Sequence, residues 1–119
     1  MKLEKLNTDF TICKLDAVVD VGGNFVFMSK TDDEISLVCE SAYVPQNVLI
    51  AEDGWKGLKI AGVLDFGLVG IIAKISNILA IVGISVFVVS TYNTDYIFAK
   101  AENYEKAIHE LENNGYEVT

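Results

Sequence analysis

The clearest pattern of hydrophobic and polar positions lies in the middle of the second half of the chain. Apolar residues recur there at helical spacing, with Lys74 and Asn77 on the opposite face: Ile71, Ile75, Ile78, Leu79 and Val82. This spacing predicts an amphipathic helix packed on a core. Gly83 follows where a helix commonly ends in the left-handed conformation. Residues 84–90 are rich in β-branched side chains and predict a strand that is apolar on both faces.

The same part of the chain continues with further elements. Residues 91–95 predict a polar turn and residues 96–100 a second strand. A second amphipathic helix is marked by Tyr104, Ala107, Ile108 and Leu111, and it ends at Asn114 and Gly115. A short strand at 116–118 follows. With an extended run at 55–64 in front, the order is βαββαβ, which is typical of an α+β, ferredoxin-like fold.

The first half of the chain predicts a similar module with reduced helices. Residues 10–15 predict a strand, and residues 16–21 allow at most one helical turn. Two further runs, 25–29 and 34–39, flank a turn at 31–33 and predict a hairpin. We find no residue-by-residue similarity between the halves, so the repeat is inferred from topology. We expect two tandem modules, residues 1–61 and 62–119, each an antiparallel sheet with helices on one face.

Charge and cysteine usage narrow the classes of function. The chain has 119 residues and a net charge of −8, and every basic residue is lysine. An acidic surface repels nucleic acid. Without arginine, an anionic ligand group would be held by backbone N–H groups or by lysine. Cys13 and Cys39 match no zinc spacing and lie in apolar runs, which favours buried, reduced thiols and a cytoplasmic protein. The alternative, a disulfide between them, stays open at this point.

A membrane location is not expected either. Met1 to Asp9 is charged and polar and lacks the apolar region of a signal peptide. Residues 75–94 carry no charge over roughly the length of a bilayer span. However, Gly83 divides a helical pattern from a strand pattern, and a helix followed by a strand does not span lipid.

Two loops carry groups that bind small molecules. In the loop at 64–70, a strand leads directly into a helix, and Gly67 and Gly70 would let a ligand approach the free N–H groups of the helix start. This is a carboxylate-sized site that needs no arginine. The alternative is that the glycines only serve a tight turn and helix packing.

The second loop, at 90–96, is rich in side-chain donors and acceptors and contains neither Gly nor Pro. Asp95 could accept from an ammonium or guanidinium group while Tyr92 stacks on the stem of the ligand. The alternative is a turn that only joins two strands.

Catalytic and metal-binding constellations are not found. His109 lies among charged residues on the exposed face of the second helix, which predicts a solvated surface histidine. No nucleophile and base pair can be assembled around it. The acids Asp32, Asp33 and Glu34 lie in a hairpin turn without the spacing of a calcium loop. We therefore expect no cofactor, no metal and no enzymatic activity.

The same segments resemble a known family. Residues 63–75 and 84–97, with similarity also at 53–58 and 15–16, resemble the bacterial ACT-domain group related to the CASTOR-type arginine sensors. This resemblance implies tandem ACT-like modules, assembly as a homodimer and an amino acid held between two ACT modules. It also implies the ligand-binding residues, which match these positions: Val69, Gly70, Ile71, Thr91, Tyr92, Thr94 and Asp95.

Two hypotheses follow from the sequence. The first is a small regulatory protein that senses an amino acid. The second is a structural or protein-interaction module that dimerises and binds no small molecule. The sequence does not identify the ligand or a downstream target.

Overall fold

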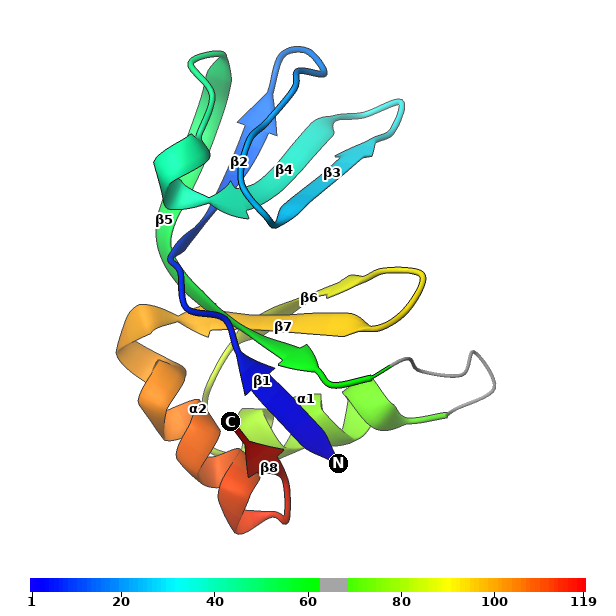
Figure 1. Cartoon of the computed structure of the whole chain (residues 1–119), viewed down its shortest axis with the longest axis vertical. Helices are drawn as coiled ribbons and strands as arrows, with labels where there is room; N and C mark the ends of the chain where they lie inside the picture. Colours follow the sequence, from blue (N-terminus) through cyan, green and yellow to red (C-terminus); the bar gives the residue numbers. More distant parts are fainter. Residues whose placement is uncertain (63–68) are drawn as a thin grey trace. The chain divides into compact units, whose positions relative to one another are not determined.

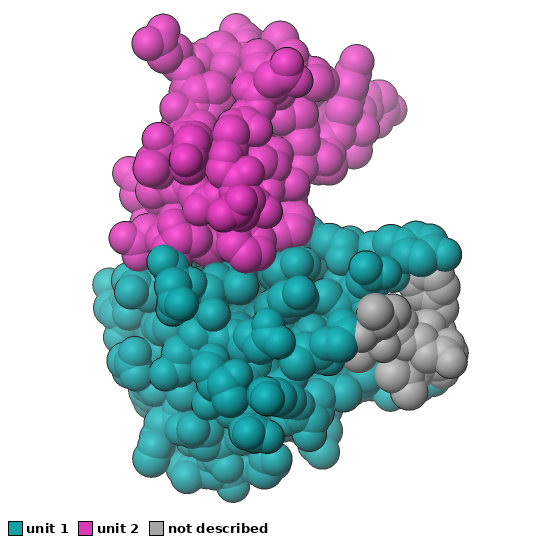
Figure 2. Space-filling view, viewed as in Figure 1, with its two compact units in different colours: residues 1–7, 56–119 teal, residues 8–55 magenta. Residues whose placement is uncertain are grey.

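The computed structural model describes residues 1–62 and 69–119, and these form two compact units (Figures 1 and 2). Unit 1 comprises residues 1–7 and 56–119, and unit 2 comprises residues 8–55. The division falls within strand β5 (Val48–Ile60), so this strand contributes residues to both units. The units therefore divide the chain at a different place from the modules predicted at 1–61 and 62–119. Residues 1–7 lie in unit 1, together with residues 56–119.

Unit 1 is an α+β unit, as the pattern predicts. Besides the end of β5, its elements are β1 (Lys2–Lys5), α1 (Ile71–Ile81), β6 (Val86–Ser90), β7 (Asp95–Lys100), α2 (Ala101–Asn113) and β8 (Glu117–Val118). From β5 onward, their order along the chain is the predicted βαββαβ order. Strand β8 pairs in parallel with β1, β1 pairs antiparallel with β5, and β7 pairs with both β5 and β6.

Helical periodicity explains the core of unit 1. In α1 the buried residues are Ile75 and Leu79, and Gly83 ends the helix region with a φ of 77°. In α2 the four apolar residues that the sequence singled out are all buried. Both helices pack on the same face of the sheet, where their apolar stripes meet Leu3, Ile60 and Ile97 from three strands (Figure 1). The prediction of helices on one face is thus confirmed for this unit.

The other face of the unit 1 sheet is also apolar, as expected from the pattern of β6. Phe98 is fully buried and stacks on Phe87, with the ring centroids 4.6 Å apart. A side chain at position 57 would collide there, because a Cβ on Gly57 would lie 2.9 Å from both Leu6 and Phe98. Close packing explains why this strand position is glycine.

Strand β1 is the main element that the pattern did not predict. Only Leu3 is fully buried in it, and its neighbours are charged. The strand is held by β5, with Leu3 opposite Ile60, and by β8, with Leu3 opposite Val118. Because a single apolar residue carries no periodicity, the sequence alone gives no sign of this strand.

Unit 2 is a four-stranded antiparallel arrangement in the order β3-β4-β2-β5. Its strands are β2 (Phe10–Leu15), β3 (Val26–Lys30), β4 (Ile35–Glu40) and the first part of β5. All its residues are described, and its one helical element is a 3₁₀ turn at Ser41–Tyr43. This agrees with the predicted loss of helices in the first half.

The two cysteines lie in the core of unit 2. Both are free and buried, as the sequence predicts, and they pack with Leu15 and Leu37. Burial, reinforced by the neighbouring Cys13, raises the pKa of the Cys39 thiol to about 12. Cys39 is therefore protonated and unreactive at neutral pH.

Each unit contains a hairpin of the same construction. Strands β3 and β4 have the lengths of β6 and β7, and β4 and β7 share one burial pattern. In both turns a threonine N–H donates to a carbonyl three residues on, from Thr31 to Glu34 (2.9 Å) and from Thr91 to Thr94 (2.8 Å). In both turns the threonine hydroxyl oxygen also accepts a hydrogen bond from the backbone N–H of the same later residue, Glu34 or Thr94. The two hairpins are therefore alike in strand length, burial pattern and turn hydrogen bonds.

The buried hydroxyl of Tyr104 gives a test of this fold. It donates to the Gly57 carbonyl (2.8 Å), and burial raises its pKa to about 12. Replacing Tyr104 by Phe should lower the unfolding free energy near pH 7 by about 0.5–1.5 kcal/mol, because the Gly57 carbonyl loses one of its two donors and keeps the Leu6 N–H. Wild type should also lose stability between about pH 10 and 12, since the unfolded tyrosine ionises first. The variant should lose less stability over this range, because the raised pKa values of Cys39 and Tyr116 still contribute to the alkaline loss.

Urea unfolding at several pH values measures both effects. Tyr43→Phe is the matched control, because Tyr43 is 49% exposed. An alkaline loss that is equal in wild type and Tyr104→Phe would contradict the assignment.

Candidate functional site

The start of helix α1 is the first part of the candidate site. Gly70 precedes the helix with a φ of 78°, a conformation that side chains rarely adopt. Among the described residues no side chain is seen to cap this end, since the N-cap residue is itself a glycine, and no acidic residue lies in the first turn. The N–H groups of the first turn and the positive end of the helix dipole are thus left for an anion. The remainder of the predicted loop, with Gly67, lies outside the described residues.

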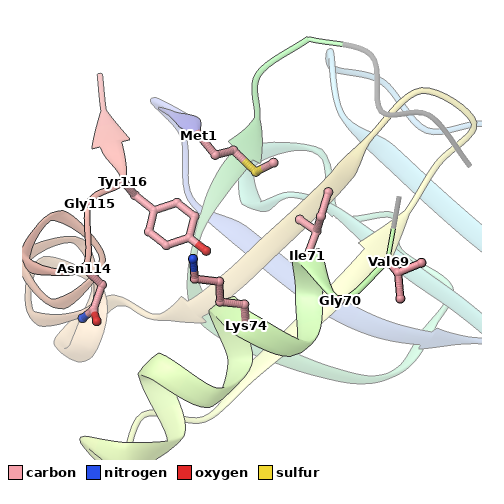
Figure 3. A pocket seen from close by; sticks show the side chains of 8 residues that line it. All are labelled: Met1, Val69, Gly70, Ile71, Lys74, Asn114, Gly115 and Tyr116. Carbon is pink, nitrogen blue, oxygen red and sulfur yellow. The ribbon is translucent and has the colours of Figure 1, made fainter. Parts of the chain in front are cut away.

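A cavity of about 270 Å³ opens at this helix start (Figure 3). It is lined by residues 69–71 and 114–116, together with Met1 and Lys74. Three sequence-predicted ligand residues, Val69, Gly70 and Ile71, therefore lie at one cavity. Val69 is 90% exposed, whereas Ile71 is half-buried and packs against the core of unit 1.

The polar groups of this cavity are mainly hydrogen-bond donors. Lys74 lies one turn into α1, and its Nζ is 5.8 Å from the ring centroid of Tyr116, within cation–π range. Tyr116 is only 8% exposed, and burial raises the pKa of its hydroxyl, so it carries a proton at neutral pH. Among the lining residues that the structure describes, there is no aspartate or glutamate. The cavity therefore suits an anionic group.

The turn between β6 and β7 is the second part of the candidate site. The Thr91 hydroxyl donates to the Thr94 carbonyl (2.9 Å), which closes the turn. Thr94 is 3% exposed, and its hydroxyl donates to the carbonyl of Ile60 at the end of β5 (2.8 Å). Tyr92 is 81% exposed, and Asp95 is half-buried at the start of β7.

The two parts lie at the same end of the unit 1 sheet, but the cavity involves only one of them. Figure 1 shows the β6–β7 turn on the side from which α1 begins. The cavity lining includes the predicted residues at the helix start and none from the turn. Thr94 uses its hydroxyl inside the protein, so the structure gives it a positioning role in the turn.

Sequence reasoning did not identify Lys74 and Tyr116 as residues of the cavity. Lys74 was placed only on the polar face of α1, although it lies one turn after Gly70. Tyr116 precedes β8 and is brought to the helix start by the fold. No spacing in the sequence connects the two residues, which explains the omission.

Other kinds of site receive no support from the described ranges, residues 1–62 and 69–119. They contain no group of three or more His, Cys, Asp or Glu residues placed to hold a metal ion. In the same part of the chain, no helix is long and apolar enough to cross a membrane. His109 is exposed on α2, as predicted.

Comparison with known proteins identifies the family. The family model of the ACT domain matches residues 50–113, which is more than half of the chain. The protein Atu0741 from Agobacterium tumefaciens is 33% identical, with a TM-score of 0.88 over 99% of this chain and 91% of that one. None of the curated proteins compared with the chain matches it. The chain belongs to the ACT domain family.

More distant structures share the fold. A protein of unknown function from Vibrio cholerae, VC0802, described as a possible transport protein, is 21% identical. Its TM-score is 0.75, over 92% of this chain and 85% of that one. Aspartate kinase from Synechocystis is 19% identical, with a TM-score of 0.71 over 99% of this chain but only 27% of the enzyme. These likenesses concern the fold alone.

Thr94 tests how the turn is positioned. Thr94→Val should lower the unfolding free energy by about 1–3 kcal/mol, because the Ile60 carbonyl loses its buried donor. Thr94→Ser keeps the hydroxyl and should retain more of the stability, and urea unfolding of both variants measures the difference. Equal stabilities for Val and Ser at this position would show that the hydrogen bond contributes nothing.

Proposed function

We propose that the chain is a small regulatory protein that senses an amino acid and catalyses no reaction. The observation that carries this proposal is the uncapped start of α1 after Gly70. Its free N–H groups and dipole would bind the carboxylate of the amino acid. They would take the role that an arginine side chain often has, and the chain contains no arginine. Membership of the ACT family supports a regulatory, ligand-binding role.

The β6–β7 turn would bind the other end of the same ligand. Asp95 supplies a carboxylate for an ammonium or guanidinium group, and the exposed ring of Tyr92 offers a surface for the ligand stem. The Thr91 hydrogen bonds and the Thr94 anchor to Ile60 hold this turn in one conformation. A preformed turn supports binding because the turn loses less conformational entropy when the ligand binds.

We also propose that the chain consists of two tandem ACT-like modules, with the first reduced to strands. The equivalent hairpins of the two units support this organisation. It is also the organisation implied by the resemblance to CASTOR-type sensors. Unit 2 has no α-helix corresponding to α1, so we expect one ligand for each chain.

A second copy of the chain is the expected partner. Three large apolar side chains in unit 1 are strongly exposed: Val69 by 90%, Ile81 by 77% and Tyr92 by 81%. Two of them belong to the proposed ligand loops, where a homodimer would cover the ligand. The same exposed residues favour the second candidate function, a dimerisation module without a ligand. Buried, protonated thiols support a reducing, cytoplasmic location.

Screening the twenty amino acids by thermal shift, followed by calorimetry, tests this proposal. At least one should raise the melting temperature saturably. Asp95→Asn should weaken its binding about tenfold or more, because a charge-assisted hydrogen bond is lost. Gly70→Ala should weaken it as well, since a Cβ would stand where the ligand approaches the backbone.

Gly83→Ala is the matched control for the glycine variant. Gly83 lies at the other end of the same helix with a φ of 77°, and a Cβ there would also meet nothing within 4 Å. The two variants therefore introduce the same backbone strain. If no amino acid binds, and the chain is nevertheless dimeric, the dimerisation module is the correct function.

A further inference from the structure

We infer that the cavity beside Lys74 and Tyr116 binds a small carboxylate that has an apolar body and no ammonium group. This goes beyond the proposed amino-acid site. The cavity shares the helix start with that site, but its polar side chains are different and Asp95 is not among them. The two sites can therefore be tested separately.

The hydroxyl of Tyr116 indicates that the cavity receives a ligand. Tyr116 is more than nine-tenths buried, with 8% of its surface exposed. Its hydroxyl has no hydrogen-bond partner within residues 1–62 and 69–119, and Figure 3 shows it pointing into the cavity. The hydroxyl oxygen itself is not enclosed by protein atoms, so it is accessible from the cavity. A ligand oxygen in the cavity would accept this hydrogen bond.

Lys74 supplies the charge. Its ammonium group lies beside the Tyr116 ring, and Figure 3 shows both side chains next to the first turn of α1. The uncapped N–H groups of that turn provide further donors. Donors from three sources therefore converge on one cavity, which is the arrangement that a carboxylate needs.

The lining also discriminates between carboxylates. Within residues 1–62 and 69–119 it contains no carboxylate side chain to pair with an ammonium group, so a free amino acid would lose the solvation of that group without compensation. The side-chain NH₂ of Asn114 already donates to the Glu110 carbonyl (2.8 Å). A ligand without an ammonium group should therefore be preferred.

The remaining lining determines the body and size of the ligand. Met1, Val69 and Ile71 contribute apolar surface. A volume of about 270 Å³ is at the lower end of the range for ligand sites, so it suits a molecule of about amino-acid size. A short aliphatic acid satisfies both conditions.

Titration with 4-methylpentanoate, followed by amide NMR and calorimetry, tests the inference. This probe has the carbon skeleton of leucine without the ammonium group. It should bind saturably and shift the amide signals of Gly70, Ile71 and Gly115. Leucine should bind at this cavity at least about tenfold more weakly, and so should 4-methylpentanamide, which lacks the negative charge.

Two substitutions locate the binding. Tyr116→Phe keeps the ring over Lys74 and removes only the hydroxyl, and Lys74→Gln removes the charge. Each should weaken 4-methylpentanoate binding about tenfold, whereas the matched controls Tyr43→Phe and Lys30→Gln in unit 2 should leave it unchanged. Unfolding curves of all four variants verify that they are folded.

Failure of this inference is distinguishable from failure of the proposed function. The inference is overturned if 4-methylpentanoate does not bind, or if its affinity is unchanged in both Tyr116→Phe and Lys74→Gln. If an amino acid still binds and depends on Asp95, the proposed function stands alone. If 4-methylpentanoate binds through Lys74 and Tyr116 while no amino acid binds, the cavity is confirmed and the amino-acid site is wrong.

Discussion

The packing of α1 is the constraint on which the site depends. Burial of Ile75 and Leu79 holds the helix on the sheet of unit 1, and the left-handed conformation of Gly70 ends the preceding loop at a defined point. The first N–H groups of the helix thereby lie at a cavity, and no side chain of the described residues caps them. The segment before β8 then completes that cavity with Tyr116, which is also part of the same core. Core packing and the binding surface therefore share residues.

Much of the fold could be predicted from the sequence, because its elements have strong periodicity. The apolar stripe of α2 and the β-branched run of β6 both predict their elements to within a few residues. Strand β1 could not be predicted, since Leu3 is its one fully buried residue and its neighbours are charged. The first part of β5 was also missed, because Leu49 and Ile50 are exposed and produce no clear alternation.

The candidate site could be predicted only in part. Gly70 can be recognised in the sequence because a glycine between a strand and a helix usually serves a left-handed backbone conformation or a close approach to the backbone. The hydroxyl of Thr94, a predicted ligand residue, donates to the Ile60 carbonyl at the end of β5, a contact that the sequence does not indicate. Lys74 and Tyr116 meet only because α1 and the segment before β8 are packed on one sheet. That juxtaposition is a property of the tertiary structure and leaves no local signal in the sequence.

The central claim is that the N–H groups after Gly70 receive the carboxylate of a ligand. The most direct measurement follows the backbone amide signals of residues 70–73 by NMR during titration with carboxylate ligands. The account predicts that these signals shift saturably and together, with a dissociation constant that matches calorimetry. Binding that shifts signals elsewhere and leaves these four unmoved would contradict it.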